Sequence, residues 1–426
     1  MQMKKYKLGD IATVEISGVD KKITDGEKEI RLCNFVDVYY NWAITIAQHD
    51  SFMLATARPN EISKFQLKKG QVALTKDSET RDDIGISTYI ADDFENVILG
   101  YHCALISPNK DILDGCYLNA LLHTDYAKKY FACNASGSGQ RYALSVEALN
   151  SFPVPIIPLH EQKQIGEIFS ALDKKIELNR QINQNLEAMA KQLYDYWFVQ
   201  FDFPNEEGKP YKSSGGEMVW NEKLKRNIPV GWHCGNLFEI AVFTNGLACQ
   251  KFRPKDDEVP LPVIKIREMH DGISVDTEEV TSNIPESVKV YNGDVLFSWS
   301  ASLEVMLWAY GLGGLNQHIF KVTSANDFPK SFYYFQLLDY VDVFKKMAEA
   351  RKTTMGHITQ DHLQQSTIAI PDNKDIADKF EELISPIFRQ IIKLQEEISN
   401  LTKQRDELLP LLMNGQVSVN SDLSAY

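Results

Sequence analysis

The sequence predicts an α+β protein in which one unit occurs twice. Each copy holds a globular domain with a twisted mixed sheet, followed by a long helix, and the two helices form an antiparallel coiled coil. Three observations predict this pseudo-twofold fold. The chain has 426 residues, 44% of them apolar, which is more than one compact core needs. Short segments recur in a fixed order, and two stretches of about 40 residues carry regularly spaced apolar residues.

Four pairs of segments carry the internal repeat. Their offsets fall in order from 229 through 223 and 214 to 213, as expected of two diverged copies with small insertions. A single match could arise by chance, but four in the same order indicate a duplication. The matched segments are residues 8–12 with 237–241, 69–74 with 292–297, 144–149 with 358–363, and Pro158 with Pro371.

The order of elements follows from composition. Each copy opens with short β-rich segments separated by Gly, Asn, Asp and Pro, and a proline precedes each helical stretch. A region rich in Gly, Pro and Ser between the copies is typical of a linker. The predicted divisions are a globular domain over 1–158, a helix over 159–200, a linker over 201–232, a globular domain over 233–371, a helix over 372–417 and a tail over 418–426.

The first helical stretch, about residues 161–199, has a heptad stripe. Eight of ten positions at alternating spacings of three and four are apolar or aromatic, which predicts a coiled-coil face. The polar positions Lys175 and Asn179 either fix the register of pairing or form a wet part of the seam. The ten positions are Ile165, Ile168, Leu172, Lys175, Asn179, Ile182, Leu186, Met189, Leu193 and Tyr196.

The second helical stretch, about residues 373–413, has a stripe that drifts toward a period of 3.6. Ser385 and Pro386 within it predict either a kink or a restart of the helix. About 40 residues at 1.5 Å each make a rod of roughly 60 Å, so we expect the rods to pair with each other, with one globular domain at each end. The stripe comprises Ile376, Phe380, Leu383, Ile387, Ile391, Leu394, Ile398, Leu401, Leu408 and Leu412.

The motifs of common enzyme classes are missing from the sequence. It contains no G-x-x-x-x-G-K-[ST] phosphate loop, no C-x-x-C pair and no Pro-Pro pair of the kind that an adenine methyltransferase loop needs. His357 and His362 are five residues apart, which does not fit an i, i+4 ligand pair. We therefore expect a chain with no catalytic residues, metal or cofactor. With no apolar leader or membrane-length run, we also expect it to be cytoplasmic.

The overall charge argues mildly against DNA binding. The net charge is −13, and residues 1–150 carry 17 Lys and Arg against 20 Asp and Glu. Any binding to DNA must therefore depend on cations gathered on one side of each domain, and it should be weak and salt-dependent in the isolated chain. Two similar domains held apart by a stiff spacer suit the reading of two separate sites on a duplex, since grooves one helical turn apart, roughly 34 Å, are within reach of rods this long.

The sequence resembles the specificity subunit of type I restriction-modification systems over nearly its whole length. The segments that carry the resemblance are residues 158–165 (PLHEQKQI), 196–204 (YWFVQFDFP), 215–219, 228–232 and 408–417 (LLPLLMNGQV). Residues 371–376 (PDNKDI) depart from it, since they lack the Glu-Gln that begins the first helix.

The resemblance implies that the two globular domains are target recognition domains, each reading half of a bipartite, asymmetric DNA site. It implies a coiled coil that sets the gap and docks two adenine methyltransferase subunits, together with two restriction and translocase subunits. S-adenosylmethionine, ATP and Mg²⁺ would then belong to those partners.

Candidate DNA contacts come from loops that supply Arg, Lys, Gln and hydroxyl groups, which contact phosphates and base edges. In the first half they are Lys76, Ser78, Arg81, Ser136, Ser138, Gln140, Arg141 and Tyr142. In the second half they are Gln250, Lys251, Arg253, Ser300, Ser302, Arg351, Lys352, Thr353, Thr354 and His357.

Two other functions remain open from the sequence. One is a self-contained DNA-modifying enzyme, although Asp173-Lys174-Lys175 lies on a predicted coiled-coil helix rather than on the strand that a nuclease motif needs. The other is a coiled-coil adaptor that does not bind DNA.

Overall fold

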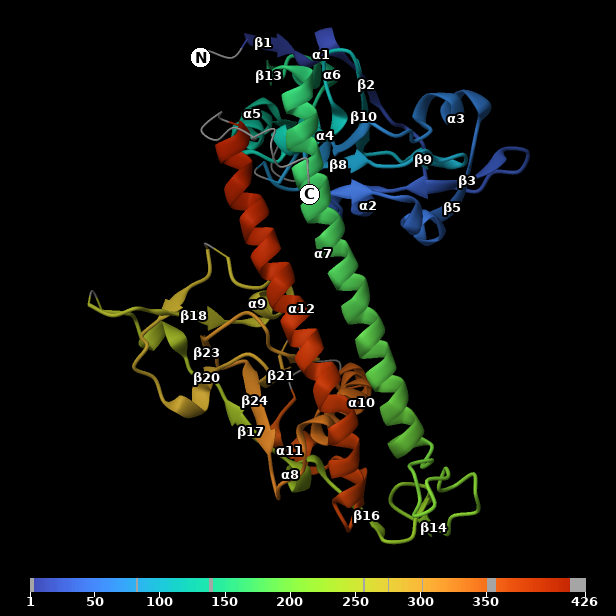
Figure 1. Ribbon diagram of the computed structural model, residues 1–426, viewed down its shortest axis with the longest axis vertical. Coiled ribbons are helices and arrows are strands. Elements are labelled where there is room, and N and C mark those ends of the chain that lie inside the picture. Colours follow the sequence, from blue (N-terminus) through green and yellow to red (C-terminus); the bar gives the residue numbers. More distant parts are fainter. Residues whose placement is uncertain are drawn as a thin grey trace. The chain divides into compact units, whose positions relative to one another are not determined.

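The computed structural model describes residues 4–81, 83–137, 141–255, 257–274, 276–300, 302–350 and 358–413. The chain forms two compact units (Figure 1). The first unit comprises residues 1–177 with 401–426, and the second comprises residues 178–400. Each of the two long helices therefore contributes one part to each unit.

The first unit is built on a five-stranded sheet in the order β2-β10-β6-β8-β4, with a three-stranded sheet β5-β3-β9 and a pair β1-β13 beside it. Strands β3 and β9 are parallel, as are β4 and β8. The bounds are β1 Lys4–Lys7, β2 Ala12–Ile16, β3 Lys28–Cys33, β4 Ala43–Ile44, β5 Met53–Ala57, β6 Val72–Thr75, β8 Ser87–Ile90, β9 Val97–Leu99, β10 Cys103–Pro108 and β13 Pro153–Ile156.

Short helices cover these sheets, and several have side-chain caps. Asp114, Thr124 and Ser145 accept hydrogen bonds from backbone N–H groups in the first turns of α4, α5 and α6, which satisfies donors that a helix leaves unpaired. The bounds are α1 Leu8–Ile11, α2 Phe35–Tyr40, η1 Ile46–Ser51, α3 Pro59–Phe65, α4 Gly115–Leu122, α5 Asp125–Asn134 and α6 Val146–Asn150.

The second unit has a four-stranded sheet β17-β24-β21-β22, a second sheet β19-β18-β23-β20 and a pair β16-β25. A hairpin β14-β15 lies in the segment predicted as a linker. The strands are β14 Met218–Asn221, β15 Arg226–Pro229, β16 Trp232–Gly235, β17 Ala241–Asn245, β18 Leu261–Ile264, β19 Glu279–Val280, β20 Lys289–Val290, β21 Val295–Ser298, β22 Glu304–Leu307, β23 Gly313–Leu315, β24 Ile319–Ser324 and β25 Ile368–Pro371. The helices are α8 Leu237–Ile240, η3 Cys249–Lys251, α9 Ile266–Asp271, η4 Glu286–Val288, α10 Lys330–Ala350 and α11 Gln360–Gln364.

The two units share one topology, as the sequence repeat predicts. The order β2-β10-β6-β8 corresponds to β17-β24-β21-β22, and β1-β13 corresponds to β16-β25. Single hydrogen bonds repeat as well. In the first unit the N–H of Asn109 donates to the carbonyl oxygen of Ile11 at 2.9 Å. In the second unit the N–H of Ala325 donates to the carbonyl oxygen of Ile240 at 3.1 Å. One difference is that the first sheet has a fifth strand, β4, whose counterpart is missing from the described part of the second unit.

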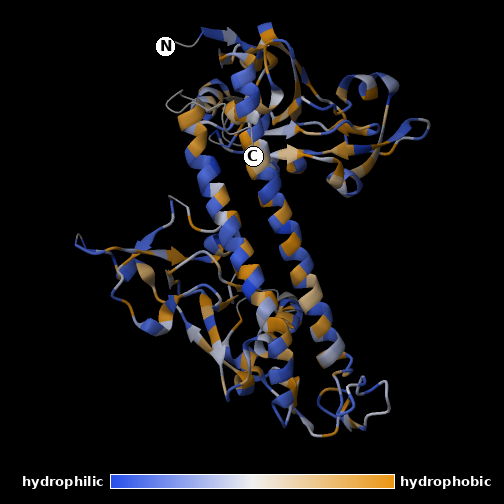
Figure 2. Ribbon diagram, viewed as in Figure 1, coloured by the Kyte–Doolittle hydropathy of each residue, from blue (hydrophilic) through white to orange (hydrophobic). Residues whose placement is uncertain are grey.

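Both predicted long helices are present. Helix α7 spans Leu159–Tyr194 and continues into a π-helical turn, Asp195–Val199, while α12 spans Asp375–Met413. Helix α12 runs through Pro386 without a break, so the alternative of a restart at Ser385 was wrong. Apolar and polar residues alternate along both helices (Figure 2). No helix in the described residues is long and apolar enough to cross a membrane.

The two helices pair in antiparallel order. In the first unit, Ile165 and Phe169 of α7 share a core with Leu409 and Leu412 of α12. In the second unit, the side-chain N–H of Asn183 in α7 donates to the carbonyl oxygen of Ile391 in α12 at 3.3 Å. Residues later in α7 therefore contact residues earlier in α12, so the two helices are antiparallel.

The predicted seam needs a correction at every second position. The expected residues Ile182, Met189 and Tyr196 are 37%, 44% and 36% exposed, and the buried positions lie one residue later. Both rows follow a heptad, so the sequence pattern alone does not separate them. Core positions such as Asn183 and Ala190 are less apolar than their exposed neighbours. The buried row is Phe169, Ile176, Asn183, Ala190 and Trp197.

A similar shift occurs at the start of α12. Leu383 was expected in the seam but is 49% exposed, whereas Ile384 is fully buried. Of the other residues in the second stripe, Phe380, Ile391, Leu394, Ile398 and Leu412 are buried, and Ile376, Ile387 and Leu408 are partly buried against the cores. In the first stripe Ile165 is buried, and Ile168, Leu172, Leu186 and Leu193 pack against the cores of their units. Leu401 is half-buried.

Candidate nucleic-acid interface

A small sheet in the first unit gathers three of the predicted DNA-contacting residues. It consists of β7 (Asp77–Ser78), β12 (Tyr142–Ala143) and β11 (Ser136–Gly137), with β12 in the middle. Tyr142 lies opposite Ser78 on one side, and Ser136 lies opposite Ala143 on the other. Segments that are 60 residues apart in sequence therefore form one surface.

Arg81 extends this surface. Its guanidinium group lies 5.2 Å from the centre of the Tyr142 ring, a cation–π contact that holds the exposed arginine in place. The Ser136 hydroxyl donates to the carbonyl oxygen of Ala143 at 3.3 Å. An arginine held flat against an aromatic ring keeps most of its N–H donors free for an acceptor.

A charged cluster lies at the edge of the same sheet, centred on the buried carboxylate of Asp77. Lys76 Nζ lies 3.0 Å from this carboxylate, and His102 Nδ1 is hydrogen-bonded to it. The Arg141 guanidinium group lies 2.6 Å from His102 Nδ1, 2.9 Å from His102 Nε2 and 3.5 Å from Asp77.

The ionisation of Asp77 suits its place at the centre of this basic cluster. Burial alone would raise the pKa of the carboxyl group, but hydrogen bonds from His102 and Lys76 lower it below its ordinary value. Asp77 is therefore an anion at neutral pH, and it fixes the positions of one lysine, one histidine and one arginine. Lys76 and Arg141 were predicted from the sequence.

Asp77 and His102 were missed. His102 has a φ of 70°, in the left-handed region where histidine is among the more frequent non-glycine residues. The sequence around it, Gly100-Tyr101-His102, indicates a turn before β10 and gives no sign of a partner 25 residues earlier. Only the pairing of β10 with β6 brings His102 to Asp77.

The second unit brings the corresponding segments together in the same way. In the first unit the backbone N–H of Lys76 donates to the carbonyl oxygen of His102 at 2.9 Å, and the N–H of Leu144 donates to the carbonyl oxygen of Lys76 at 2.8 Å. In the second unit the N–H of Trp299 donates to His318 at 3.3 Å, and the N–H of Ile358 donates to Trp299 at 3.0 Å. The backbone around Trp299 therefore matches that around Lys76, at the offset of 223 that relates residues 69–74 to residues 292–297.

The side chains at these equivalent places differ. Trp299 takes the place of Lys76, and its ring lies 5.5 Å from that of His318. Ser300 is only 7% exposed, which argues against the predicted contact between its hydroxyl group and a base. Ser302 is exposed, and its carbonyl oxygen accepts a hydrogen bond from Ser298. A half-buried tryptophan beside a histidine thus takes the place that a lysine occupies in the first unit.

The remaining candidates divide into two groups. Gln250 and Lys251 lie in the turn η3, and Arg253 follows it. The loop that contains them begins near Leu247, whose carbonyl oxygen accepts a hydrogen bond at 2.8 Å from the N–H of Gln317, next to His318. All three candidates are exposed. The others lie outside the described residues: Ser138, Gln140, Arg351, Lys352, Thr353, Thr354 and His357.

Within the described residues, no group of three or more His, Cys, Asp or Glu side chains could hold a metal ion. The interface described above therefore rests on cations, hydroxyl groups and aromatic rings.

Comparison with known proteins gives a consistent result. The family model of the type I restriction modification DNA specificity domain matches residues 2–188 and 229–403, once in each half. The chain is 25% identical over 319 residues to the type I restriction enzyme MjaIX specificity subunit of Methanocaldococcus jannaschii, covering 73% of this chain and 71% of that protein. It is 24% identical over 413 residues to the HindI specificity subunit of Haemophilus influenzae, covering 83% and 88%. The crystal structure of a type I restriction-modification S subunit from M. genitalium superposes with a TM-score of 0.57 at 14% identity, covering 96% of each chain, which shows a shared fold.

Proposed function

Because the chain belongs to the family of type I restriction-modification specificity subunits, we propose that each of its two units reads one half of a bipartite DNA site. The observation that carries the proposal is the repeated convergence of three segments, around Lys76, His102 and Leu144 in one unit and around Trp299, His318 and Ile358 in the other. The two surfaces have the same backbone frame and different side chains. Two different half-sites, and hence an asymmetric target, follow from that difference.

In the first unit, Arg141 and Arg81 are the side chains best suited to read guanine. An arginine can donate two hydrogen bonds to O6 and N7 of one guanine, and such a contact needs a guanidinium group held in a fixed orientation. Asp77 with His102 orients Arg141, and Tyr142 orients Arg81. Lys76 and the hydroxyl groups of Ser78 and Ser136 supply contacts to phosphates.

The proposal assigns no catalytic step to this chain. Adenine methylation, translocation and cleavage belong to two methyltransferase subunits and two restriction subunits, which bind the S-adenosylmethionine, ATP and Mg²⁺. The paired helices α7 and α12, which both units share, would set the unread gap and provide the docking surface for the methyltransferase subunits. The net charge of −13 supports this division of labour, since tight DNA binding then needs basic surface from the partners.

The test is to map methylated adenines on genomic DNA in cells that carry this chain with its methyltransferase subunit. We expect methylation at one two-part sequence with a fixed gap. The purified chain, incubated alone with DNA, S-adenosylmethionine and Mg²⁺, should transfer no methyl groups and make no cuts. Modification by the chain alone would show a self-contained enzyme, and a complete complex that methylates without sequence preference would contradict the reading role.

A further inference from the structure

Trp42 of the first unit fills a space between the main sheet and the helices. Its ring stacks on His123 at 4.3 Å, and the guanidinium group of Arg405 from α12 lies 5.1 Å from the ring centre. Its carbonyl oxygen accepts hydrogen bonds from the N–H of Tyr89 at 2.9 Å and from the side chain of Asn119 at 3.1 Å. Trp42 directly precedes β4, which pairs in parallel with the outer edge of β8.

The internal repeat identifies the corresponding place in the second unit. Helix α10 begins 215 residues after α4. The buried rows of α7 and α12 match at the same offset, for example Ile165 with Phe380 and Ile176 with Ile391. The first unit also contains the end of α12, and the second unit also contains the end of α7. These two parts match at the same offset, Leu409 with Tyr194 and Leu412 with Trp197, and all four residues are buried. The counterparts of His123, Asn119 and Arg405 are then Leu338, Tyr334 and Ala190. The register of β21 with β22 makes Leu307 the counterpart of Tyr89.

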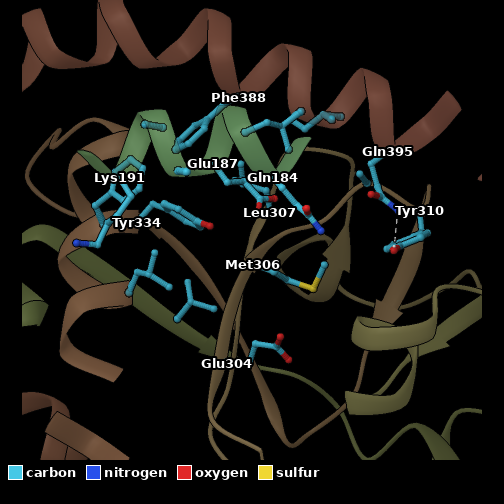
Figure 3. Close-up of a pocket in the computed structure, with 18 residues that line it drawn as sticks. Gln184, Glu187, Lys191, Glu304, Met306, Leu307, Tyr310, Tyr334, Phe388 and Gln395 are labelled. Carbon is cyan, nitrogen blue, oxygen red and sulfur yellow. Dashed lines mark hydrogen bonds between the residues drawn. The ribbon is translucent and has the colours of Figure 1, made fainter. Parts of the chain in front are cut away.

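These four counterparts line one groove in the second unit. The groove has a volume of about 570 Å³ and lies between α7, α10, α12 and β22 (Figure 3). No strand pairs with the outer edge of β22 in the described part of the chain. By its place after α9, Ile273 is the residue that corresponds to Trp42, but it is 37% exposed and does not line the groove. Among the described residues of the second unit, none therefore fills the space that Trp42 and β4 occupy in the first unit.

The chemistry of the groove suits a large apolar side chain that also carries a hydrogen-bond donor. Its walls are mostly apolar and aromatic, with Tyr334, Phe388 and Met306 among them, and Gln184, Glu304 and Gln395 also line it. Glu187 lies at the rim, where partial desolvation raises the pKa of its carboxyl group. Among the described residues Glu187 has no hydrogen-bond or ion-pair partner, whereas the neighbouring Lys191 is paired with Asp339 at 2.9 Å. An acceptor that has lost part of its hydration and has no donor favours an indole N–H or a cation.

We propose that this groove binds an extended segment of a partner protein, which adds as a strand to the free edge of β22 and inserts a tryptophan between α7 and α10. Strand addition supplies backbone hydrogen bonds, and the groove supplies the selectivity for the side chain. The segment repeats in trans what residues 42–44 do within the first unit. The inference does not depend on DNA reading.

The probe is a synthetic peptide with the sequence of residues 39–46, YYNWAITI, with lysines added at both ends for solubility. We expect it to bind the full chain, and the same peptide with alanine in place of tryptophan to bind at least tenfold more weakly. Binding is measured by isothermal titration. Equal affinity of the two peptides, or no binding of either, would overturn the proposal.

Variants of the chain locate the site. Leu338→Trp fills the groove and Glu187→Lys reverses the charge at its rim, and each should weaken the binding of the tryptophan peptide at least fivefold. Glu382→Lys, an exposed acid on α12 that does not line the groove, is the matched control and should bind as the original chain does. If Leu338→Trp fails to fold, Glu187→Lys decides the outcome, because Glu187 lies at the rim of the groove and makes no hydrogen bond or ion pair among the described residues. A chain that dimerises in sedimentation experiments, and becomes monomeric on Glu187→Lys, would show that a second copy is the occupant and would overturn the choice of a partner protein.

Discussion

Arg141 shows how a single residue can depend on a neighbour that the sequence does not reveal. As a residue of a polar loop it is one of many exposed cations, but the structure places it against His102 and the buried Asp77. Orientation, rather than charge alone, distinguishes a side chain that reads a base from one that contacts a phosphate.

This gives the first prediction. Arg141→Ala should weaken binding of the assembled complex to its target by about 1–3 kcal/mol and relax sequence preference in one half-site only. Asp77→Asn should relax the same half-site, because the amide no longer anchors His102 and Arg141. Methylated-site mapping measures the sequence preference of both variants. Lys110→Ala, an exposed lysine beyond the other end of β10, serves as the control; an equal change in this control would show that charge alone matters.

His123 gives a prediction about pH. Burial lowers its pKa to about 4, while its ring stacks on Trp42 and donates a hydrogen bond to the carbonyl oxygen of Ser87 at 2.8 Å. The unfolded chain binds the proton near pH 6.5, so the folded state loses stability as the pH falls from 6.5 toward 4. The loss attributable to this histidine should reach about 2 kcal/mol at pH 5.

The check is a comparison of thermal unfolding at pH 7.5 and pH 5 for the original chain and for His123→Gln. The variant should be less stable at pH 7.5 and should lose less on acidification. Identical pH dependence of the two proteins would show that His123 is not buried as a neutral ring.

At the scale of elements, the two long helices show what a periodic pattern leaves open. The sequence predicts their existence and nearly their ends, because the apolar repeat persists over ten positions. It does not show which of two adjacent rows faces the core. Ile182 and Met189 look better suited to a seam than Asn183 and Ala190, yet the latter are buried, because close approach to α12 and to the aromatic core favours small or hydrogen-bonding side chains.

A pair of substitutions tests this register. Ile176 is 1% exposed and Ile182 is 37% exposed, and both lie on α7. Ile176→Asp should destabilise the chain by more than about 3 kcal/mol, because it buries a charge without a partner, whereas Ile182→Asp should cost about 1 kcal/mol or less. Denaturant unfolding of the two variants measures the difference. Comparable losses, or the reverse order, would favour the row predicted from the sequence.

At the scale of the whole molecule, duplication accounts for the backbone that the two halves share, and later divergence accounts for the side chains in which they differ. The backbone frame at Lys76 and Trp299 is the same, while the side chains on it differ. The fifth strand and its tryptophan occur in one unit only, among the residues described. One fold can therefore carry two surfaces with different side chains and, in the second unit, one groove.

The role proposed for the paired helices can be tested at this scale. Removing seven residues from α7 and seven from the matching part of α12 keeps the apolar rows in phase and shortens both helices by about 10 Å. We expect the complex to methylate the same two half-sites with a shorter gap. Removing seven residues from α7 alone is the control and should disrupt folding. A changed half-site with an unchanged gap would contradict the idea that the helices set the spacing.

The sequence by itself determined the duplication, the α+β class, the two long helices and the family, because these depend on local periodicity and on motifs that lie within single segments. It also identified several polar residues of the candidate interface, since their loops are recognisable from composition. Only the tertiary structure decided which helix row is buried, that Asp77 and His102 hold Arg141, and that no described residue of the second unit fills the counterpart of the Trp42 site. Each of these depends on strands or helices far apart in the chain meeting in space, and no local pattern encodes the partner.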